Sequence, residues 1–324
     1  MTQKPIVLKV DGATYFEMPL LANYLTEHNI DLIEASLSEA GNVISQHAPK
    51  VIVTGATPVG KELMDAGIQH GLRGVVKAGT GLDNVDCTYA ESLGLTIGNT
   101  PNYVVETVAE YAIGLILALA RKVHPVQQAM RTSGWIDITP DWLGMEVHGK
   151  TIGLIGFGRI ARSLARIAHA GFGMNVLTYD PFVDAAEVTA HHAQKVDGLD
   201  EMLSQSDIVS VHTSLNPSTQ NLISSQQFAA MKPTALLVNV SRGGIIDEAA
   251  LLAALSSSAI AGAALDVFAQ EPINTSTDPV VSQLTKMDNM LISPHIAWYT
   301  AEAGDRLQKT VAQRCHEIII ADTK

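Results

Sequence analysis

Three charged or titratable side chains in the second half of the sequence are suited to acid–base and electrostatic chemistry. Arg242 precedes two glycines, Glu271 precedes a proline, and His295 follows one. A histidine can donate and accept a proton near neutral pH, and a nearby carboxylate favours its protonated form. An arginine can hold a substrate carboxylate in a bidentate manner. Hydride transfer at a carbonyl needs these functions, but each residue alone is also a common turn, surface or capping residue.

A glycine-rich turn stands upstream of these residues. The apolar stretch Thr151–Ile155 runs directly into Gly156-Phe157-Gly158-Arg159-Ile160-Ala161, the Gly-x-Gly-x-x-Gly/Ala pattern of dinucleotide-binding turns. Gly156 permits a tight turn, Gly158 lets a pyrophosphate approach the backbone, and Ala161 lets the following helix pack on a sheet. The pattern predicts a dinucleotide site, with a nucleotide-free strand–helix turn as the alternative.

The residue that ends the next apolar stretch indicates which dinucleotide binds. Asn175–Tyr179 is followed by Asp180, and no arginine occurs in Pro181–Asp184. A carboxylate at this position can accept hydrogen bonds from the adenosine ribose hydroxyls, and it repels a 2′-phosphate. The sequence therefore predicts NAD rather than NADP.

The elements that must position these residues alternate between short apolar strands and helices, which predicts an α/β fold with parallel sheets. Strands are expected at Ile6–Val10, Val51–Thr54, Gly74–Ala78, Leu95–Ile97, Thr151–Ile155, Asn175–Tyr179, Ile208–His212, Ala235–Val240, Ala261–Leu265 and Met290–Ile292. Helices are expected at Asp86–Leu93, from about Asn102 to His124, and at Arg159–Ala170, Glu248–Leu255 and Thr300–Ile320. Arg131–Lys150 is expected to be an irregular connection.

The composition narrows the class of protein. Charged residues make up 17% of the chain and apolar residues 47%, which excludes a disordered chain and predicts apolar surface in a subunit interface. The apolar run Tyr111–Ala120 is shorter than the roughly 20 residues that span a bilayer. With 33 acidic against 21 basic residues, nucleic-acid binding is disfavoured.

The cysteines and the N-terminus indicate the compartment. Cys87 and Cys315 are the only cysteines, so neither a disulfide framework nor a cysteine metal site is expected. The N-terminus lacks the basic start and long apolar stretch of a signal peptide. We expect a cytoplasmic protein. His191 and His192 are adjacent but have no evident third ligand, so we expect a solvated helix end or loop and no metal.

Five stretches together make the sequence resemble the D-isomer-specific 2-hydroxyacid dehydrogenase family, which includes phosphoglycerate dehydrogenase-like enzymes. They occur in family order and cover most of the chain from about residue 75: Lys77–Asp86, the Gly156 motif, Asn239–Asp247, Ala264–Phe268 and Ser293–Trp298. The resemblance implies two Rossmann-like domains and a homodimer. Residues 1–100 and 296–324 are expected to form a discontinuous substrate domain completed by the C-terminal helix. Residues 101–295 are expected to form the NAD-binding domain, with a long dimerisation helix at about 102–124.

The resemblance also implies a reaction and its residues. In the reductive direction hydride reaches C2 of a 2-oxo acid, His295 gives a proton to the forming alkoxide, Glu271 is the partner of His295, and Arg242 holds the carboxylate and carbonyl. Gly79 and Gly81 are expected to present backbone N–H groups to the substrate carboxylate, with Lys77 and Asn102 close by. Asp266 is expected to hold the nicotinamide carboxamide. The remaining cofactor contacts are expected at Thr80, Gly156, Gly158, Arg159, Ile160, Asp180, Thr213, Val240, Ser241, Arg242 and His295.

Departures from the family pattern leave the substrate open. Phosphoglycerate dehydrogenases usually carry arginines where this chain has Thr54 and Lys77, and no regulatory domain is expected beyond Lys324. Trp298-Tyr299, with Pro101–Tyr103 and Glu106-Thr107, is similar to the transcriptional corepressor branch. Trp298 either forms an apolar wall for a bulky 2-oxo acid or packs in the core or an interface. The alternatives to a general 2-hydroxyacid dehydrogenase are a 3-phosphoglycerate dehydrogenase and a non-enzymatic NAD-sensing binding protein.

Overall fold

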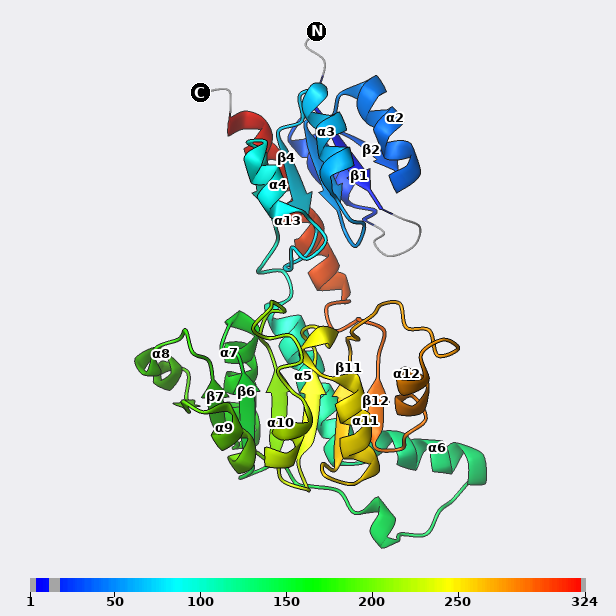
Figure 1. Ribbon diagram of the computed structural model, residues 1–324, viewed down its shortest axis with the longest axis vertical. Coiled ribbons are helices and arrows are strands. Elements are labelled where there is room, and N and C mark those ends of the chain that lie inside the picture. The colour runs from blue at the N-terminus through cyan, green and yellow to red at the C-terminus, as the bar shows by residue number, and fades with distance from the viewer. Residues whose placement is uncertain (1–3, 12–17, 322–324) are drawn as a thin grey trace. The chain divides into compact units, whose positions relative to one another are not determined.

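The chain folds into two compact units (Figure 1). A computed structural model describes residues 4–11 and 18–321. The first unit contains the described residues up to Val104 and those from Tyr299 onward, and the second spans Val105–Trp298. Each unit is built on its own parallel sheet. The predicted fold class, two Rossmann-like domains with parallel sheets, is confirmed.

The sheet of the first unit has five parallel strands in the order β2-β1-β3-β4-β5. Val51 to Val53 and the inner residues of the neighbouring strands are fully buried, as expected for strands that are covered by helices on both faces. The strands are β1 (Ile6–Val10), β2 (Asp31–Ala35), β3 (Val51–Thr54), β4 (Gly74–Lys77) and β5 (Thr96–Gly98).

The last helix of the chain completes this first unit. Its N-terminus is capped by Thr300, whose hydroxyl accepts a hydrogen bond from Ala303 N–H. It packs against α1 and the strands β3, β4 and β5, while α2 and α3 pack on each other and α4 contacts β5. The helices are α1 (Leu21–Glu27), α2 (Leu37–His47), α3 (Lys61–Gln69), α4 (Cys87–Ser92) and α13 (Ala301–Ile320).

The sheet of the second unit has seven parallel strands in the order β12-β11-β10-β9-β6-β7-β8. The chain order reverses between β6 and β9, and ligands of open α/β sheets bind outside the carboxyl ends of the strands at such a point. The strands are β6 (Thr151–Ile155), β7 (Asn175–Tyr179), β8 (Gln194–Lys195), β9 (Ile208–Val211), β10 (Leu236–Asn239), β11 (Gly262–Leu265) and β12 (Met290–Ile292).

Helices cover both faces of this second sheet. One layer holds α5, which packs on α7, β10, β11 and β12; the other holds α9, α10, α11 and α12 (Figure 1). α8 packs against the edge strand β8. The α-helices are α5 (Val105–Ala120), α7 (Arg159–Arg166), α8 (Ala185–Ala190), α9 (Leu199–Gln205), α10 (Ser225–Ala230), α11 (Glu248–Ser256) and α12 (Pro279–Leu284), with a π-helical turn η2 (Ile167–Gly171) after α7.

The expected helix from Asn102 to His124 is wrong in its bounds. α5 ends at Ala120, and Lys122 takes a left-handed conformation with φ of 49°. A second helix, α6 (Val123–Ser133), then begins at the end of the expected helix and extends into the region expected to be irregular, and it buries none of its residues. The short 3₁₀ turn η1 (Pro140–Trp142) follows. Within the apolar run Tyr111–Ala120, Ala112, Ile116 and Ala120 are buried, and most of the other residues are partly exposed. Within the described ranges, no helix is both long and apolar enough for a membrane span.

Candidate active site

Three loops at the carboxyl edge of the second sheet bring the expected catalytic residues together. Arg242 follows β10, Glu271 follows β11 and His295 follows β12, and these strands are neighbours in the sheet. Because all the strands are parallel, their carboxyl ends lie at one edge. The Gly156 turn after β6 and Asp180 after β7 lie at the same edge.

His295 and Glu271 are in direct contact. Nδ1 of His295 lies 2.7 Å from Oε2 of Glu271, and the two side chains are 34% and 30% exposed. His295 has a φ of 56°, in the left-handed region that few non-glycine residues adopt. Its backbone N–H donates to the carbonyl of Asp266 at 2.7 Å. The loop thus holds the imidazole beside the carboxylate and leaves it partly accessible.

The neighbours of Glu271 favour the ionised form of its carboxyl group. Burial acts to raise the pKa of its carboxyl, but the hydrogen bond and charge of His295, the Phe268 N–H and the charge of Arg242 outweigh burial and lower that pKa. The Phe268 N–H donates to Oε1 of Glu271 at 2.9 Å. Gly243 allows this arrangement, because a Cβ there would lie 1.8 Å from the Phe268 carbonyl carbon. The Arg242 loop can therefore approach the Glu271 loop only with glycine at this position.

The loop that carries Arg242 is fixed by the buried Asn239. The Asn239 Nδ2 donates to the Arg242 carbonyl at 2.9 Å, and its Oδ1 accepts from Ser241 N–H at 3.0 Å. Nη1 of Arg242 donates to the Ser241 carbonyl at 2.8 Å. Val240 is buried, whereas Ser241 and Arg242 are partly exposed. Asn239 belongs to one of the five stretches that resemble the family, but the sequence predicted no role for it.

Asp266 lies beneath the His295 loop. It is 1% exposed. Its Oδ1 accepts from Ser293 Oγ at 2.5 Å and Ile296 N–H at 3.0 Å, and its Oδ2 accepts from Ala297 N–H at 2.8 Å. Both carboxylate oxygens are used within the protein, so Asp266 positions the loop that holds His295.

The turn after β6 has the features that a dinucleotide pyrophosphate needs. Gly156 has a φ of 87°, and a Cβ there would lie 2.9 Å from the Thr213 nitrogen. A Cβ on Gly158 would meet no described atom within 4 Å, so space is open beside the start of α7. Arg159 is exposed and Ile160 is half-buried in the first turn of that helix. These residues fit the phosphates of NAD.

Asp180 supports the same turn from the end of β7. Its Oδ2 accepts from Phe157 N–H at 2.8 Å and its Oδ1 accepts from Phe182 N–H at 2.9 Å. The carboxylate is half-buried, and its remaining lone pairs can accept from ribose hydroxyls. The expected ribose contact therefore has a second function, because the same group fixes the glycine turn.

His212 belongs to this edge but was not anticipated. Its Nε2 lies 2.8 Å from Ser210 Oγ, and its backbone N–H donates to the Ile155 carbonyl at 2.8 Å. Burial lowers the pKa of His212 to about 4, so the imidazole is neutral at physiological pH. The next residue, Thr213, accepts a short hydrogen bond from Ser241 Oγ. The only available sequence signal was a histidine at the end of a predicted strand.

The expected substrate residues before position 103 lie at the carboxyl edge of the first sheet, after β4 and β5. Nζ of Lys77 donates to the Gly55 carbonyl. The Gly79 N–H donates to Thr100 Oγ1 at 2.9 Å, so a carboxylate there must share a donor that is already used. The Thr80 carbonyl accepts from Asn99 Nδ2 at 2.8 Å. Gly81 is half-buried and Asn102 is exposed.

Three other residues that the sequence analysis singled out lie in the second unit. Trp298, the last residue of that unit, is partly buried. His191 and His192 directly follow α8, where the His191 ring meets Phe157 edge-on and the His192 ring stacks on His169. Among the described residues, no three His, Cys, Asp or Glu side chains form a metal-binding group.

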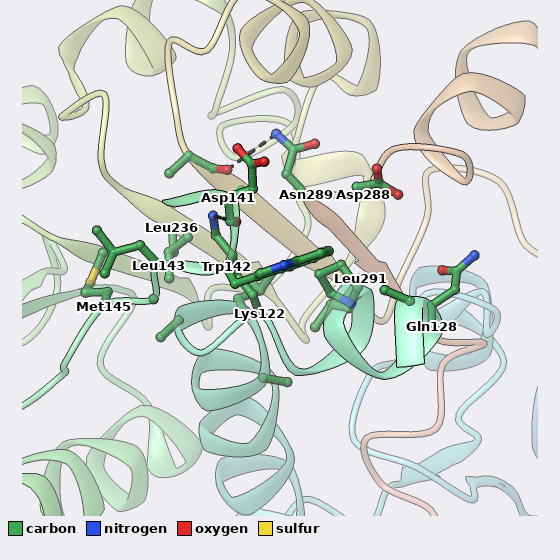
Figure 2. Close-up of a pocket in the computed structure, with 18 of the residues that line it drawn as sticks. Lys122, Gln128, Asp141, Trp142, Leu143, Met145, Leu236, Asp288, Asn289 and Leu291 are labelled. Atoms are coloured by element: carbon green, nitrogen blue, oxygen red, sulfur yellow. Dashed lines mark hydrogen bonds between the residues drawn. The ribbon is translucent and has the colours of Figure 1, made fainter. Parts of the chain in front are cut away.

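A groove of about 850 Å³ lies at the amino end of β10–β12, at the opposite end of those strands from His295. Figure 2 shows Trp142 and Leu291 among the side chains that line it. α6 forms one wall, and Lys122 ties it to the η1 segment by donating to the Asp141 carbonyl at 2.7 Å. Three large apolar side chains in the segment between α6 and β6 are strongly exposed: Trp135 at 86%, Ile138 at 98% and Leu143, which lines the groove, at 77%.

The two sheets and the dinucleotide turn define a two-domain protein of the Rossmann class. The chain belongs to the D-isomer specific 2-hydroxyacid dehydrogenase family: residues 113–297 match the family's NAD binding domain. It is 35% identical over 289 residues to the D-3-phosphoglycerate dehydrogenase of Synechocystis sp., covering 89% of this chain and 50% of that protein. The chain thus spans about half the length of the D-3-phosphoglycerate dehydrogenases that it matches.

Two further relatives match over most of their length. A Staphylococcus aureus protein, provisionally named a 2-hydroxyacid dehydrogenase, is 38% identical over 268 residues, covering 82% of this chain and 81% of that one. The D-isomer specific 2-hydroxyacid dehydrogenase of Lactobacillus delbrueckii ssp. bulgaricus, solved in its NAD complexed form, superposes with a TM-score of 0.82 at 25% identity. That alignment covers 98% of this chain and 97% of the other.

Proposed function

We propose that this protein is an NAD-dependent D-2-hydroxyacid dehydrogenase that interconverts a 2-hydroxy acid and a 2-oxo acid. The observation that carries the proposal is the 2.7 Å contact between His295 and Glu271, at the same sheet edge as Arg242 and the dinucleotide turn. An acid–base group with a carboxylate partner, a cation for a carboxylate substrate and a nicotinamide site are what reversible hydride transfer requires.

The side chains of His295, Glu271 and Arg242 transfer the proton and stabilise the negative charge that forms during the reaction. NADH, when bound, supplies hydride to C2 of the 2-oxo acid. His295, protonated and oriented by Glu271, donates its proton to the forming alkoxide oxygen. Arg242 stabilises the negative charge that develops on that oxygen and holds the substrate carboxylate. In oxidation, neutral His295 accepts the hydroxyl proton instead.

We assign the expected cofactor and substrate contacts to the two units of the chain. We propose that Gly156, Gly158, Arg159 and Ile160 receive the pyrophosphate and that Asp180 binds the adenosine ribose. Thr213, Val240 and Ser241 line the rest of the cofactor site in the second unit. We propose the first unit as the substrate domain, in which Lys77 and the backbone N–H of Gly81 bind the substrate carboxylate with Asn102 nearby. Trp298 contacts the substrate's carbon chain.

A panel of 2-oxo acids tests the reaction. Purified protein is mixed with NADH and glyoxylate, hydroxypyruvate, 3-phosphohydroxypyruvate, or branched or aromatic 2-oxo acids, and NADH oxidation is followed. His295→Ala is the matched variant; it should lose turnover and keep NADH binding. NADH binding without turnover of any substrate would favour a corepressor-like NAD-sensing protein instead.

We also propose that the protein is a homodimer in the cytoplasm. The exposed side chains of Trp135, Ile138 and Leu143, together with the groove beside α6, support a subunit interface. We propose that the interface includes the segment after α5 as well as the expected helix. Cys87 and Cys315 are both free thiols, which suits a reducing compartment.

A further inference from the structure

Phe157 stands between the two glycines of the turn after β6, and side chains hold the peptide groups on both of its sides. Glycine permits many backbone conformations, so the peptide planes beside Phe157 can rotate unless other groups fix them. The Phe157 N–H donates to Oδ2 of Asp180 at 2.8 Å, which fixes the first plane. The second plane contains the Phe157 carbonyl and the Gly158 N–H, and it needs a contact of its own.

Arg162 supplies this second contact from α7. Its Nε donates to the Phe157 carbonyl at 3.0 Å. The guanidinium also lies over the Phe157 ring, with Cζ 5.8 Å from the ring centroid, and Phe157 is fully buried. One arginine therefore holds both the carbonyl and the ring of the residue between the glycines.

Glu187, on α8, holds the guanidinium of Arg162 in this position. Nη1 of Arg162 lies 2.7 Å from Oε1 of Glu187, and the two side chains are 28% and 46% exposed. An arginine can donate to a carbonyl and to a carboxylate at the same time, because its N–H groups diverge from one rigid plane. The carboxylate also compensates the charge of Arg162, so this arginine offers little net positive charge to a ligand.

The contact with Arg162 sets the direction of the Gly158 N–H. In a trans peptide the C=O and the following N–H point in opposite directions, so a carbonyl that faces Arg162 turns the Gly158 N–H away from it. Gly158 directly precedes α7, and the first N–H groups of a helix have no acceptor within that helix. The Gly158 N–H is thus a donor whose direction is fixed before any ligand binds.

We propose that Arg162 is a positioning residue for cofactor binding, which holds the Phe157–Gly158 peptide so that the Gly158 N–H donates to the pyrophosphate of NAD. The inference rests on the proposed function, from which it takes the place of the pyrophosphate. Arg162 acts through the backbone of the turn and not by attracting the phosphates with its charge.

Dissociation constants measured without turnover test this role. Arg162→Met removes the N–H donors and keeps a long apolar side chain. Its Kd for NADH, from fluorescence titration, should rise about tenfold. Its Kd for ADP-ribose, which carries the pyrophosphate but no nicotinamide, should rise by a similar factor. With saturating NADH and a 2-oxo acid that the wild type reduces, kcat should stay within about twofold of the wild type.

The comparison of Kd with kcat separates positioning from a loss of folded protein. Unfolded protein lowers kcat and the number of binding sites together and leaves Kd unchanged. An unchanged Kd for NADH in Arg162→Met therefore overturns the inference. If no 2-oxo acid is reduced, the proposed function fails, while the Kd values for NADH and ADP-ribose still decide the role of Arg162.

Two further variants separate geometry from charge. Arg162→Lys keeps the charge but has one nitrogen in place of the divergent donors, so its Kd for NADH should rise at least about fivefold. A Kd close to the wild-type value in this variant would show that the charge suffices, and it would overturn the inference. Arg166→Met is the matched control, because Arg166 lies one turn later on α7 and pairs with Glu106 at 2.8 Å. Its Kd should stay within about twofold of the wild type, and a rise equal to that of Arg162→Met would contradict a specific role for Arg162.

Discussion

Nδ1 of His295 lies 2.7 Å from Oε2 of Glu271, although 24 residues separate them in the sequence. The contact exists because β11 and β12 are parallel neighbours and both loops leave the same edge of the sheet. The His295 loop is held below by Asp266, and the Glu271 loop is held by Phe268 N–H. The acid–base pair is therefore fixed from two sides before any ligand binds.

Glu271→Gln should lower kcat for 2-oxo acid reduction about 10- to 100-fold, while KM for NADH changes little. Glutamine keeps an acceptor for the imidazole N–H but removes the charge that favours the protonated ring. Reduction needs the protonated ring, so its rate falls as the pH rises, and this alkaline limb should move to lower pH than in the wild type. Steady-state kinetics between pH 5 and 9 measure both effects.

Glu248→Gln is the control for the Glu271 variant, since Glu248 also accepts a backbone N–H near this loop, from Ala269 at 2.7 Å, without contacting His295. It should leave the pH profile in place. An unchanged profile in Glu271→Gln would remove the carboxylate from its role as the partner of His295.

Asp180→Asn should relax the discrimination against NADPH while keeping most of the structure of the glycine turn. Asparagine retains one oxygen for the Phe157 N–H but no longer repels a 2′-phosphate. The ratio of kcat/KM for NADH over NADPH should fall about tenfold or more. Asp180→Ala should also relax the preference, and it should weaken NADH binding further because the turn loses its acceptor. If both variants keep the wild-type preference for NADH over NADPH, Asp180 does not contact the adenosine ribose.

The buried strands were the most predictable part of the fold. Thr151–Ile155 and Asn175–Tyr179 were predicted with the bounds that the structure gives to β6 and β7, because strands of a parallel sheet are continuous apolar runs ended by glycine or a polar residue. β2 was not predicted. It is an edge strand that carries Asp31 and Glu34 and buries none of its five residues, so its composition lacks that signal.

Long-range contacts and breaks in the backbone explain the other differences between the sequence prediction and the structure. The end of α5 was missed because the left-handed residue at the break is Lys122 and not a glycine, and Pro125 lies in the first turn of the next helix. The carboxylate of Asp266 could be recognised from the sequence, but not its three hydrogen bonds to a loop almost 30 residues away. Such contacts depend on which strands are neighbours, and that order is a property of the folded chain.

His212 should make the protein less stable at acid pH. Because burial lowers the pKa of His212 to about 4, below its unfolded value of 6.5, the unfolded chain binds the extra proton between these two values. The free energy of unfolding therefore rises with pH through this window and is fully restored above it. His212→Gln keeps a polar contact for Ser210 but does not titrate.

Urea unfolding at pH 7.5 and pH 5.0 measures this effect. When the pH is lowered from 7.5 to 5.0, the free energy of unfolding of the wild type should fall by on the order of 2 kcal/mol more than that of His212→Gln. Comparing the two proteins at both pH values cancels the contribution of the other titrating groups. Equal losses in both would show that His212 is already accessible to protons in the folded state.

Ile138→Glu should dissociate the proposed dimer. Ile138 is 98% exposed in a single chain, so a charge there costs the folded monomer little, whereas it opposes burial in an interface. In a two-fold dimer each substitution counts twice, so the dissociation constant should rise at least about 100-fold. Sedimentation velocity at micromolar concentration measures it. Phe182→Glu is the control, since Phe182 is 92% exposed but follows β7, far along the sheet from the groove. A wild-type monomer, or a dimer that tolerates Ile138→Glu, would contradict the interface assigned to this segment.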